Sequence, residues 1–289
     1  MTPHYFAYKQ KLDWLVYKDL ASREKKPELK EVLEKLIDHE LEDYKFWRQF
    51  IDKEIQIPKW KIYVFRFLRA ILGLTFTAKF LEGREEGMIK KYESYLETVE
   101  DAKQREEIRE IIRHERFHEA SFLELIKEEK VEFVSSIVLG MNDGLIELTG
   151  ALAGFSLALS KPAIVAMAGL ITGISAALSM AASAYMATKH EVGSKKPPAK
   201  VATYTGISYI IVVAILVTPY FIFSNVFISL TVMLGLVILI IAGMTLYTSV
   251  LFRRKFHHQF GQMLLFSLGV APISFTIAYL FQRFSGIGV

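Results

Sequence analysis

Two patterns of apolar residues divide this chain of 289 residues. Before residue 133, apolar residues recur every three or four positions, which is typical of amphipathic helices. After it they form long stretches, each close to the roughly 20 residues that a helix needs to cross hydrocarbon. The pattern predicts an all-α chain: a helical bundle over residues 1–132, then a five-helix transmembrane domain over residues 133–289. The five stretches cover about 134–159, 163–188, 201–223, 226–252 and 262–282.

The first domain is predicted to be a four-helix bundle. Helices are expected at about 4–22, 27–54 and 60–97, and from about 103 onward. Pro27 and Pro58 set two of these boundaries, because proline fits the first turn of a helix and interrupts a helix that precedes it.

Acidic residues are distributed very unevenly. Of the 31 in the chain, 28 lie before residue 133, and only Asp143, Glu147 and Glu191 follow. Asp143 and Glu147 lie four residues apart in the first long apolar stretch, so they share one face of a helix. A charge at bilayer depth costs roughly 2.5–3.5 kcal/mol or more and usually marks an ion pathway. The pattern therefore predicts that these two acids handle a metal ion or a proton.

Basic residues predict the orientation of the membrane domain. Loops 189–200 and 253–258 hold seven Lys and Arg residues, whereas the opposite side holds only Lys161 and Arg283. Because cytoplasmic loops carry the excess of positive charge, we expect five spans with the N-terminus in the cytoplasm and the C-terminus outside. The N-terminal segment is too charged for a secretory signal.

The amino-acid composition limits which side chains can bind a metal and which partners are expected. The chain has no cysteine, which excludes thiolate ligands and thiol nucleophiles. Carboxylate, imidazole, amide and thioether ligands remain, and this set favours Fe²⁺ or Mn²⁺ over Cu⁺. The net charge is only +4 and no basic block is present, so no nucleic-acid partner is expected.

Carboxylates interrupt the apolar stripes of the predicted bundle helices. They recur three residues apart where apolar side chains would be expected, and a bound cation would compensate for the cost of facing a core. The sequence therefore predicts a metal site built from Glu40, Asp43, Glu82, Glu85, Glu115 and His118.

The segments ELED (40–43), EGRE (82–85) and ERFH (115–118) resemble the ferritin-like, rubrerythrin-type domain. That resemblance implies a di-iron centre, and with it a membrane-anchored di-iron oxidase or peroxide scavenger as an alternative function. Two positions depart from the family pattern. Gln10 stands where the family has a glutamate, with Asp13 one turn later as a substitute, and Asp43 stands where it has a histidine.

The segment His114 to His118 also spells the H-E-x-x-H motif of zinc proteases. In that alternative His114 and His118 bind zinc and Glu115 is the general base. It leaves the acids of the other helices unexplained, so His114 and His39 are expected at the edge of the carboxylate site instead.

A second resemblance lies in the membrane domain. The segments GMNDGLIELTGALAGFS (140–156), LSMAASAYMATKHE (178–191) and VTPY (217–220) are similar to the vacuolar iron transporter family. The resemblance implies a homodimer that exports Fe²⁺ or Mn²⁺ from the cytoplasm in exchange for protons. By position it makes Asp143 and Met180 pathway residues; the local chemistry adds Asn142 and Glu147. We therefore expect a metal exporter whose N-terminal bundle captures its cargo.

Overall fold

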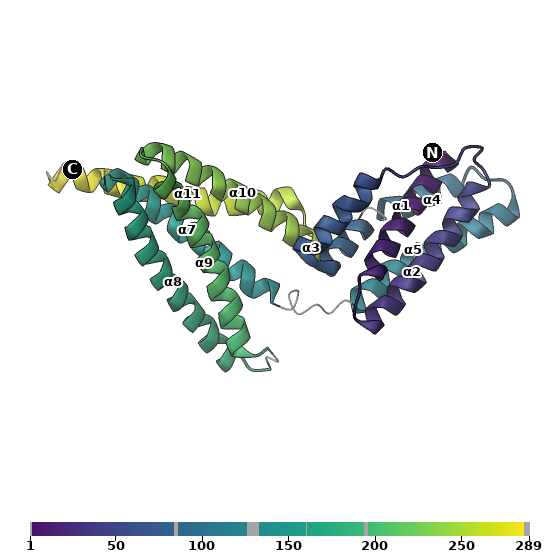
Figure 1. Cartoon of the computed structure of the whole chain (residues 1–289), viewed down its shortest axis with the longest axis horizontal. Helices are drawn as coiled ribbons and strands as arrows, with labels where there is room; N and C mark the ends of the chain where they lie inside the picture. The colour runs from purple at the N-terminus through teal and green to yellow at the C-terminus, as the bar shows by residue number, and fades with distance from the viewer. Residues whose placement is uncertain (1, 84–85, 126–132, 160, 194–195, 286–289) are drawn as a thin grey trace. The chain divides into compact units, whose positions relative to one another are not determined.

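The computed structural model describes residues 2–83, 86–125, 133–159, 161–193 and 196–285, and every regular element in these ranges is an α-helix (Figure 1). This confirms the all-α prediction. The chain divides into two compact units, Met1–Glu128 and Glu129–Val289. Each unit is described by itself below.

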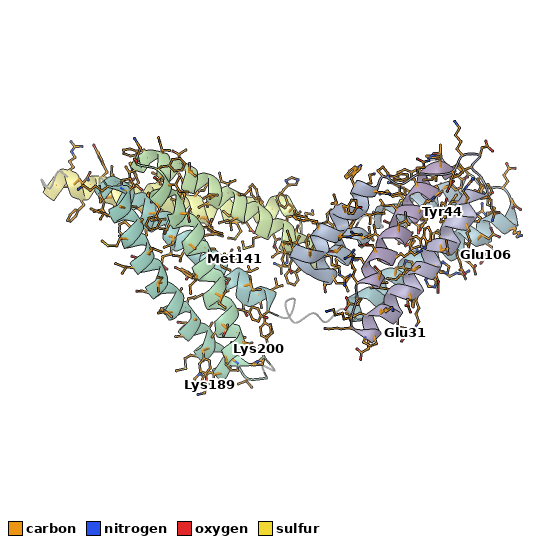
Figure 2. All side chains as sticks on the ribbon, viewed as in Figure 1. Glu31, Tyr44, Glu106, Met141, Lys189 and Lys200 are labelled. Atoms are coloured by element: carbon orange, nitrogen blue, oxygen red, sulfur yellow. The ribbon has the colours of Figure 1, made fainter. Side chains whose placement is uncertain are left out.

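Unit 1 is held together by the contacts that its first and last helices each make with the helices between them. Helix α1 packs against α2 and α3, and α5 packs against α2, α3 and α4. Exposed carboxylates such as Glu31 and Glu106 cover its outside (Figure 2). The helices are α1 (Pro3–Ser22), α2 (Pro27–Arg48), α3 (Lys59–Glu82), α4 (Glu86–Leu96) and α5 (Ala102–Leu125).

Two separate apolar clusters form the core of unit 1. One includes Leu12 of α1 and Leu36 of α2, and the other includes Ala7 of α1 and Phe46 of α2. On both helices the two clusters leave a gap of several residues. The polar side chains considered below fill this gap, so the arrangement of the core determines where they meet.

Two helix boundaries differ from the prediction. The expected helix 60–97 is two helices, and α3 is itself broken at Gly73, which has φ 89° and ψ 170°. Helix α2 ends at Arg48 rather than near residue 54. Beyond it, Ile55 is buried and Ile51 and Ile57 pack against the same cluster from a non-helical connection. The prediction that Pro58 sets the end of this helix is therefore wrong: the helix ends ten residues earlier.

Unit 2 is organised around its first helix. Helix α7 contacts all four of the other helices in the unit. Lys189 at the end of α8 and Lys200 at the start of α9 lie at the same end of the unit (Figure 2). The helices are α7 (Val134–Ala158), α8 (Pro162–His190), α9 (Pro198–Ile222), α10 (Val226–Phe252) and α11 (Phe256–Ser285).

Among the described residues, four helices are long and apolar enough to cross a membrane: α8, α9, α10 and α11. Helix α7 has 25 residues, which correspond to about 37 Å of length. It lacks the required apolar character because Asn142, Asp143 and Glu147 interrupt it. The membrane character of unit 2 is thus confirmed through four helices, and the fifth span stays a prediction.

We expect Gly73→Ala to destabilise unit 1 by about 1–3 kcal/mol, because the backbone angles of Gly73 lie in a region that only glycine adopts readily. All three tryptophans of the chain lie in unit 1, so tryptophan fluorescence follows its unfolding within the intact protein. Gly87→Ala is the matched control: it lies in α4 with open space around an added Cβ. That change should leave stability unchanged or raise it by about 0.5–1 kcal/mol. Equal melting temperatures for the Gly73→Ala variant and the wild type would contradict the expectation.

Candidate metal site and ion pathway

Helix α7 carries the two membrane-domain acids on its middle turns. Asp143 is half-buried and Glu147 is exposed. The Tyr209 hydroxyl of α9 donates a hydrogen bond of 2.7 Å to Glu147 Oε2. Gly144 makes room for this contact, because a Cβ there would lie 3.3 Å from the Tyr209 ring. The sequence analysis did not identify Tyr209, whose role depends on a contact between residues 62 positions apart.

Met180 of α8 lies close to the level of Asp143. A Cβ on Gly173 would meet Leu148, and one on Gly169 would meet Leu152, so α8 runs antiparallel to α7 in a defined register. Continuing this register by two turns places Met180 level with Met141. The Met180 side chain is partly buried and packs against the apolar core of unit 2.

Asn142 lies in a different environment from the acids. It lines a pocket of about 550 Å³ together with Thr245 of α10 and Gln259 of α11. Among the described residues, the side-chain oxygens of these three residues have no hydrogen-bond partner. The structure therefore places Asn142 toward α10 and α11, whereas Glu147 meets α9.

In unit 1, buried polar side chains from three helices fill the gap between the two apolar clusters. Each of them is at most 3% exposed, and burial to this extent is unusual for carboxylates unless they are paired or bind an ion. They are Gln10 of α1, Glu40 and Asp43 of α2, and Glu115 and His118 of α5. Four of the six predicted metal ligands are thus brought into one core. The Glu82 side chain and Glu85 lie outside the described residues.

Gln10 takes the place of the glutamate expected from the family pattern. Its Nε2 donates to Glu115 Oε1 at 2.9 Å and to the Tyr92 hydroxyl at 2.8 Å. Asp13, one turn along α1, is also buried, and its charge contributes to the electrostatics of Glu115. Helix α1 therefore supplies an amide and a carboxylate to this core.

Three histidine rings connect the carboxylates of α2. His114 Nδ1 lies 3.1 Å from Asp43 Oδ1, and His39 Nδ1 lies 2.9 Å from His118 Nε2. The His39 ring is stacked between the other two, with ring centroids 4.3 Å from His114 and 5.1 Å from His118. His118 Nδ1 faces Glu40 Oε1 at 3.6 Å. His39 and His114 therefore touch the predicted ligands directly, a contact that the apolar pattern did not reveal.

This stack also bears on the zinc-protease motif. His114 Nδ1 is directed to Asp43, whereas His118 has its Nε2 next to His39 and its Nδ1 facing Glu40. Glu115 is bonded to Gln10 on another helix. The described geometry gives no support to the protease alternative.

Burial dominates the electrostatics of the cluster. It raises the pKa of Glu115 to about 8, with a further contribution from the charge of Asp43. Burial also raises the pKa of Asp43, although the hydrogen bond with His114 opposes this. It lowers the pKa of His118 to about 3, and the neighbouring histidines act in the same direction. In the metal-free protein, burial therefore shifts all three groups toward their neutral forms.

The donor atoms suit a divalent cation. Asp43 Oδ2, Glu115 Oε2 and His118 Nδ1 have no hydrogen-bond partner in the described part of the chain. Buried polar atoms without partners are costly, and carboxylate oxygen with imidazole nitrogen is a ligand set that Fe²⁺ and Mn²⁺ accept. No three His, Asp or Glu side chains among the described residues converge on one point as they stand. Binding would therefore require these side chains to move together.

An acidic opening leads to the cluster from the surface. A pocket of about 240 Å³ is lined by Asp43 and His114 together with Glu42, Glu107 and Glu110. Lys45 also lines it, but the carboxylates outnumber this lysine, so the pocket would concentrate cations next to Asp43 and His114.

For the metal-free protein, Glu115→Gln should raise the stability of unit 1, increasingly so between pH 4.5 and pH 8. The folded-state pKa of Glu115 lies above its ordinary value of 4.5, so its favourable contribution is complete below pH 4.5 and is lost as pH rises toward 8. Glutamine removes this dependence, and the gain at pH 8 should be on the order of a few kcal/mol. Denaturant unfolding with a chelator, followed by tryptophan fluorescence, measures it. Glu31→Gln, on the exposed face of α2 and away from the cluster, is the control. A gain that does not grow with pH would refute this account of Glu115.

Comparison with known proteins bears on unit 2. Residues 134–196 match the family model described as the VIT family. A search of curated proteins gives no match. The matched segment includes helices α7 and α8, and with them Asp143, Glu147 and Met180. The match and the four apolar helices together support a membrane protein that transports metal ions.

Proposed function

We propose that this protein exports Fe²⁺ or Mn²⁺ from the cytoplasm in exchange for protons. The observation that carries the proposal is the coincidence of the family match with the acid-bearing helix: residues 134–196 include Asp143 and Glu147 of α7 and Met180 of α8. Carboxylates are rare in membrane helices and usually belong to ion or proton pathways.

The proposed pathway uses one carboxylate face of α7. Asp143 binds the ion, and Met180, at a similar level on α8, supplies a polarisable thioether that a partly dehydrated transition metal accepts. Protons and metal compete for the same carboxylates, which couples outward metal movement to inward proton movement. Tyr209 holds the Glu147 carboxylate beside Asp143 through its 2.7 Å hydrogen bond. Asn142 lies at the pocket formed with α10 and α11 and would act at the entrance of the path.

In this proposal α7 is the first of five spans, the N-terminus is cytoplasmic, the C-terminus is outside, and the protein is a homodimer. The exposed Glu147 supports the dimer: a carboxylate on the outer face of a membrane helix is costly next to lipid. A second copy of the chain packed against this face would remove it from lipid. The basic loops that contain Lys189 and Arg254 support the orientation.

Unit 1 is proposed to be a ferritin-like bundle that captures the cargo ion. The proposed ligands are Glu40, Asp43, Glu82, Glu85, Glu115 and His118, an arrangement that could accommodate a di-iron centre. The unpartnered oxygens of Asp43 and Glu115 support capture, because a cation would balance the charges of groups that are otherwise driven to bind protons. The acidic opening at Asp43 and His114 provides access.

A second candidate is a membrane-anchored di-iron oxidase or peroxide scavenger, which the buried carboxylate and histidine cluster of unit 1 would also suit. Oxygen or peroxide consumption on addition of Fe²⁺ distinguishes it. An oxidase would consume oxygen or peroxide as purified protein, without a gradient across a membrane. An exporter would transport Mn²⁺ across a membrane without oxidising it.

We expect Asp143→Asn to reduce metal flux at least about tenfold, which corresponds to about 1.4 kcal/mol in the barrier, while the protein remains folded. The change removes a charge from the membrane domain rather than adding one. The measurement is Mn²⁺ uptake into proteoliposomes under a pH gradient. Glu191→Gln, which neutralises an exposed acid after α8, is the matched control and should transport normally. Equal flux in the two variants would exclude Asp143 from the pathway.

Mn²⁺ should stabilise unit 1 in the intact protein, by about 2.7 kcal/mol at one hundred times the dissociation constant. Binding should strengthen as pH rises, because protons compete for the same groups. Glu115→Gln should abolish most of the Mn²⁺-induced rise in the tryptophan-detected melting temperature. Glu31→Gln, on the exposed face of α2, should retain it. A full Mn²⁺ shift in the Glu115→Gln variant would show that the cluster is not the capture site.

A further inference from the structure

The first half of α3 exposes a continuous apolar stripe. Trp60, Tyr63, Val64, Phe67 and Ile71 are 61%, 54%, 43%, 64% and 58% exposed. The last four lie three, four, seven and eleven residues after Trp60, so all five share one face of the helix. Single exposed apolar residues are ordinary, but five of them on one face, three of them aromatic, form a contiguous surface that requires a covering partner.

The charge on α3 is entirely positive over most of its length. Between residues 59 and 81 the helix contains Lys59, Lys61, Arg66, Arg69 and Lys79 and no acid, although the rest of unit 1 is rich in acids. A helix with aromatic residues on one face and lysine and arginine beside them is typical of segments that lie in the membrane interface. Tryptophan and tyrosine in particular concentrate at the level of the lipid headgroups.

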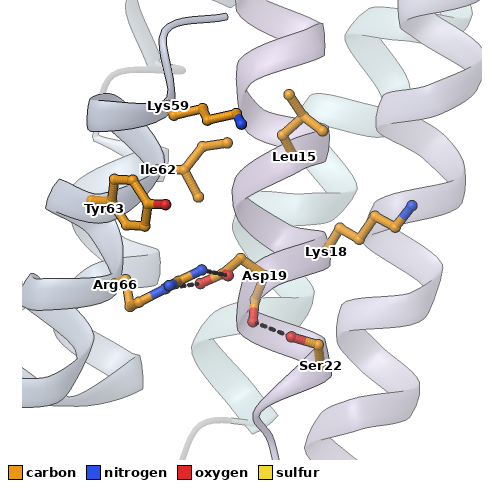
Figure 3. A pocket seen from close by; sticks show the side chains of 8 residues that line it. All are labelled: Leu15, Lys18, Asp19, Ser22, Lys59, Ile62, Tyr63 and Arg66. Atoms are coloured by element: carbon orange, nitrogen blue, oxygen red, sulfur yellow. Dashed lines mark hydrogen bonds and ion pairs between the residues drawn. The ribbon is translucent and has the colours of Figure 1, made fainter.

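A basic pocket borders the stripe (Figure 3). It has a volume of about 430 Å³ and is formed by α1 and α3, with Lys18, Lys59 and Arg66 among its lining residues. Asp19 is the acid of the pocket, and Arg66 binds both of its oxygens, at 2.6 and 3.3 Å. The two lysines therefore give the pocket a net positive charge. Tyr63 lines the pocket and also belongs to the stripe, so the basic and apolar surfaces are continuous.

The break at Gly73 divides α3 into a first half that packs only one face against the core, through Phe65, and a second half that is buried more completely. After it, residues Leu74 to Ala78 are all at most 3% exposed, whereas the stripe lies entirely before it. The change of direction allows one helix to pack its second half inside unit 1 while its first half presents the stripe outward.

We propose that the first half of α3 lies in the membrane surface, with the stripe at the boundary of headgroups and acyl chains and with the phosphate of an anionic lipid at the basic pocket. The charge complementarity favours a bilayer over a protein partner. Among the described residues, four helices of the same chain are long and apolar enough to cross a membrane, and only eight residues separate Leu125 from Val134. Fully extended, that connection covers about 30 Å, so the bilayer is within reach of unit 1.

The absence of cysteine makes a direct test possible in the full chain. A nitroxide attached to Phe67→Cys reports its depth in nanodiscs that contain phosphatidylcholine and phosphatidylglycerol. We expect oxygen to reach this label more readily than a water-soluble nickel complex does. Glu34→Cys, on the exposed face of α2, should show the opposite preference.

Two outcomes would overturn the proposal. Equal access of the nickel complex to both labels would show that the stripe faces water. A Phe67→Cys label that neither reagent reaches would show that protein covers the stripe, and dipolar broadening between labels would identify that protein as a second copy of the chain.

The pocket is tested separately with the Lys18→Gln, Lys59→Gln double variant, which keeps the Arg66–Asp19 pair intact. In the parent protein the depth signal of the Phe67→Cys label should be greater with phosphatidylglycerol than with phosphatidylcholine alone. The double variant should lose this difference while the tryptophan-detected melting temperature is retained. A difference that persists would exclude the pocket as the lipid-phosphate site.

Discussion

The cost of removing carboxylates from water governs both units of this protein. In unit 1, burial raises the pKa of Glu115 to about 8 and that of Asp43 above its ordinary value, so the metal-free cluster resists ionisation. In unit 2, Asp143 and Glu147 interrupt a helix that is otherwise apolar. In both places a cation or a proton would relieve the same penalty. Exchange between the two is the simplest chemistry that such groups support.

The sequence predicted the helical class and the apolar helices because these depend on local periodicity. It also identified Glu40, Asp43, Glu115 and His118, since polar residues at apolar positions are visible without a structure. All four are buried together in unit 1. Their function as ligands stays a prediction, as do the roles of Glu82 and Glu85.

Other features depend on contacts between distant residues and could not be read from a local pattern. His39 stacks between two histidines of α5, and Tyr209 bonds to Glu147 across two helices. The break at Gly73 was missed because glycine alone does not reveal its backbone angles. The five exposed apolar residues of α3 were assigned to a helix of the bundle, because periodicity gives the apolar face of a helix but not what covers it.

The polar residues of α7 affect the order in which the helices of unit 2 can enter a membrane during synthesis. Helices α8 to α11 are apolar enough to enter a bilayer as individual segments during synthesis. Helix α7 is synthesised before them, yet its two acids and Asn142 make it a poor segment for independent partition into lipid. Its contacts with all four later helices supply the polar and close-packed surroundings that lipid lacks. In the proposed five-span arrangement, the first span to leave the ribosome is thus the one whose insertion has to wait for the others.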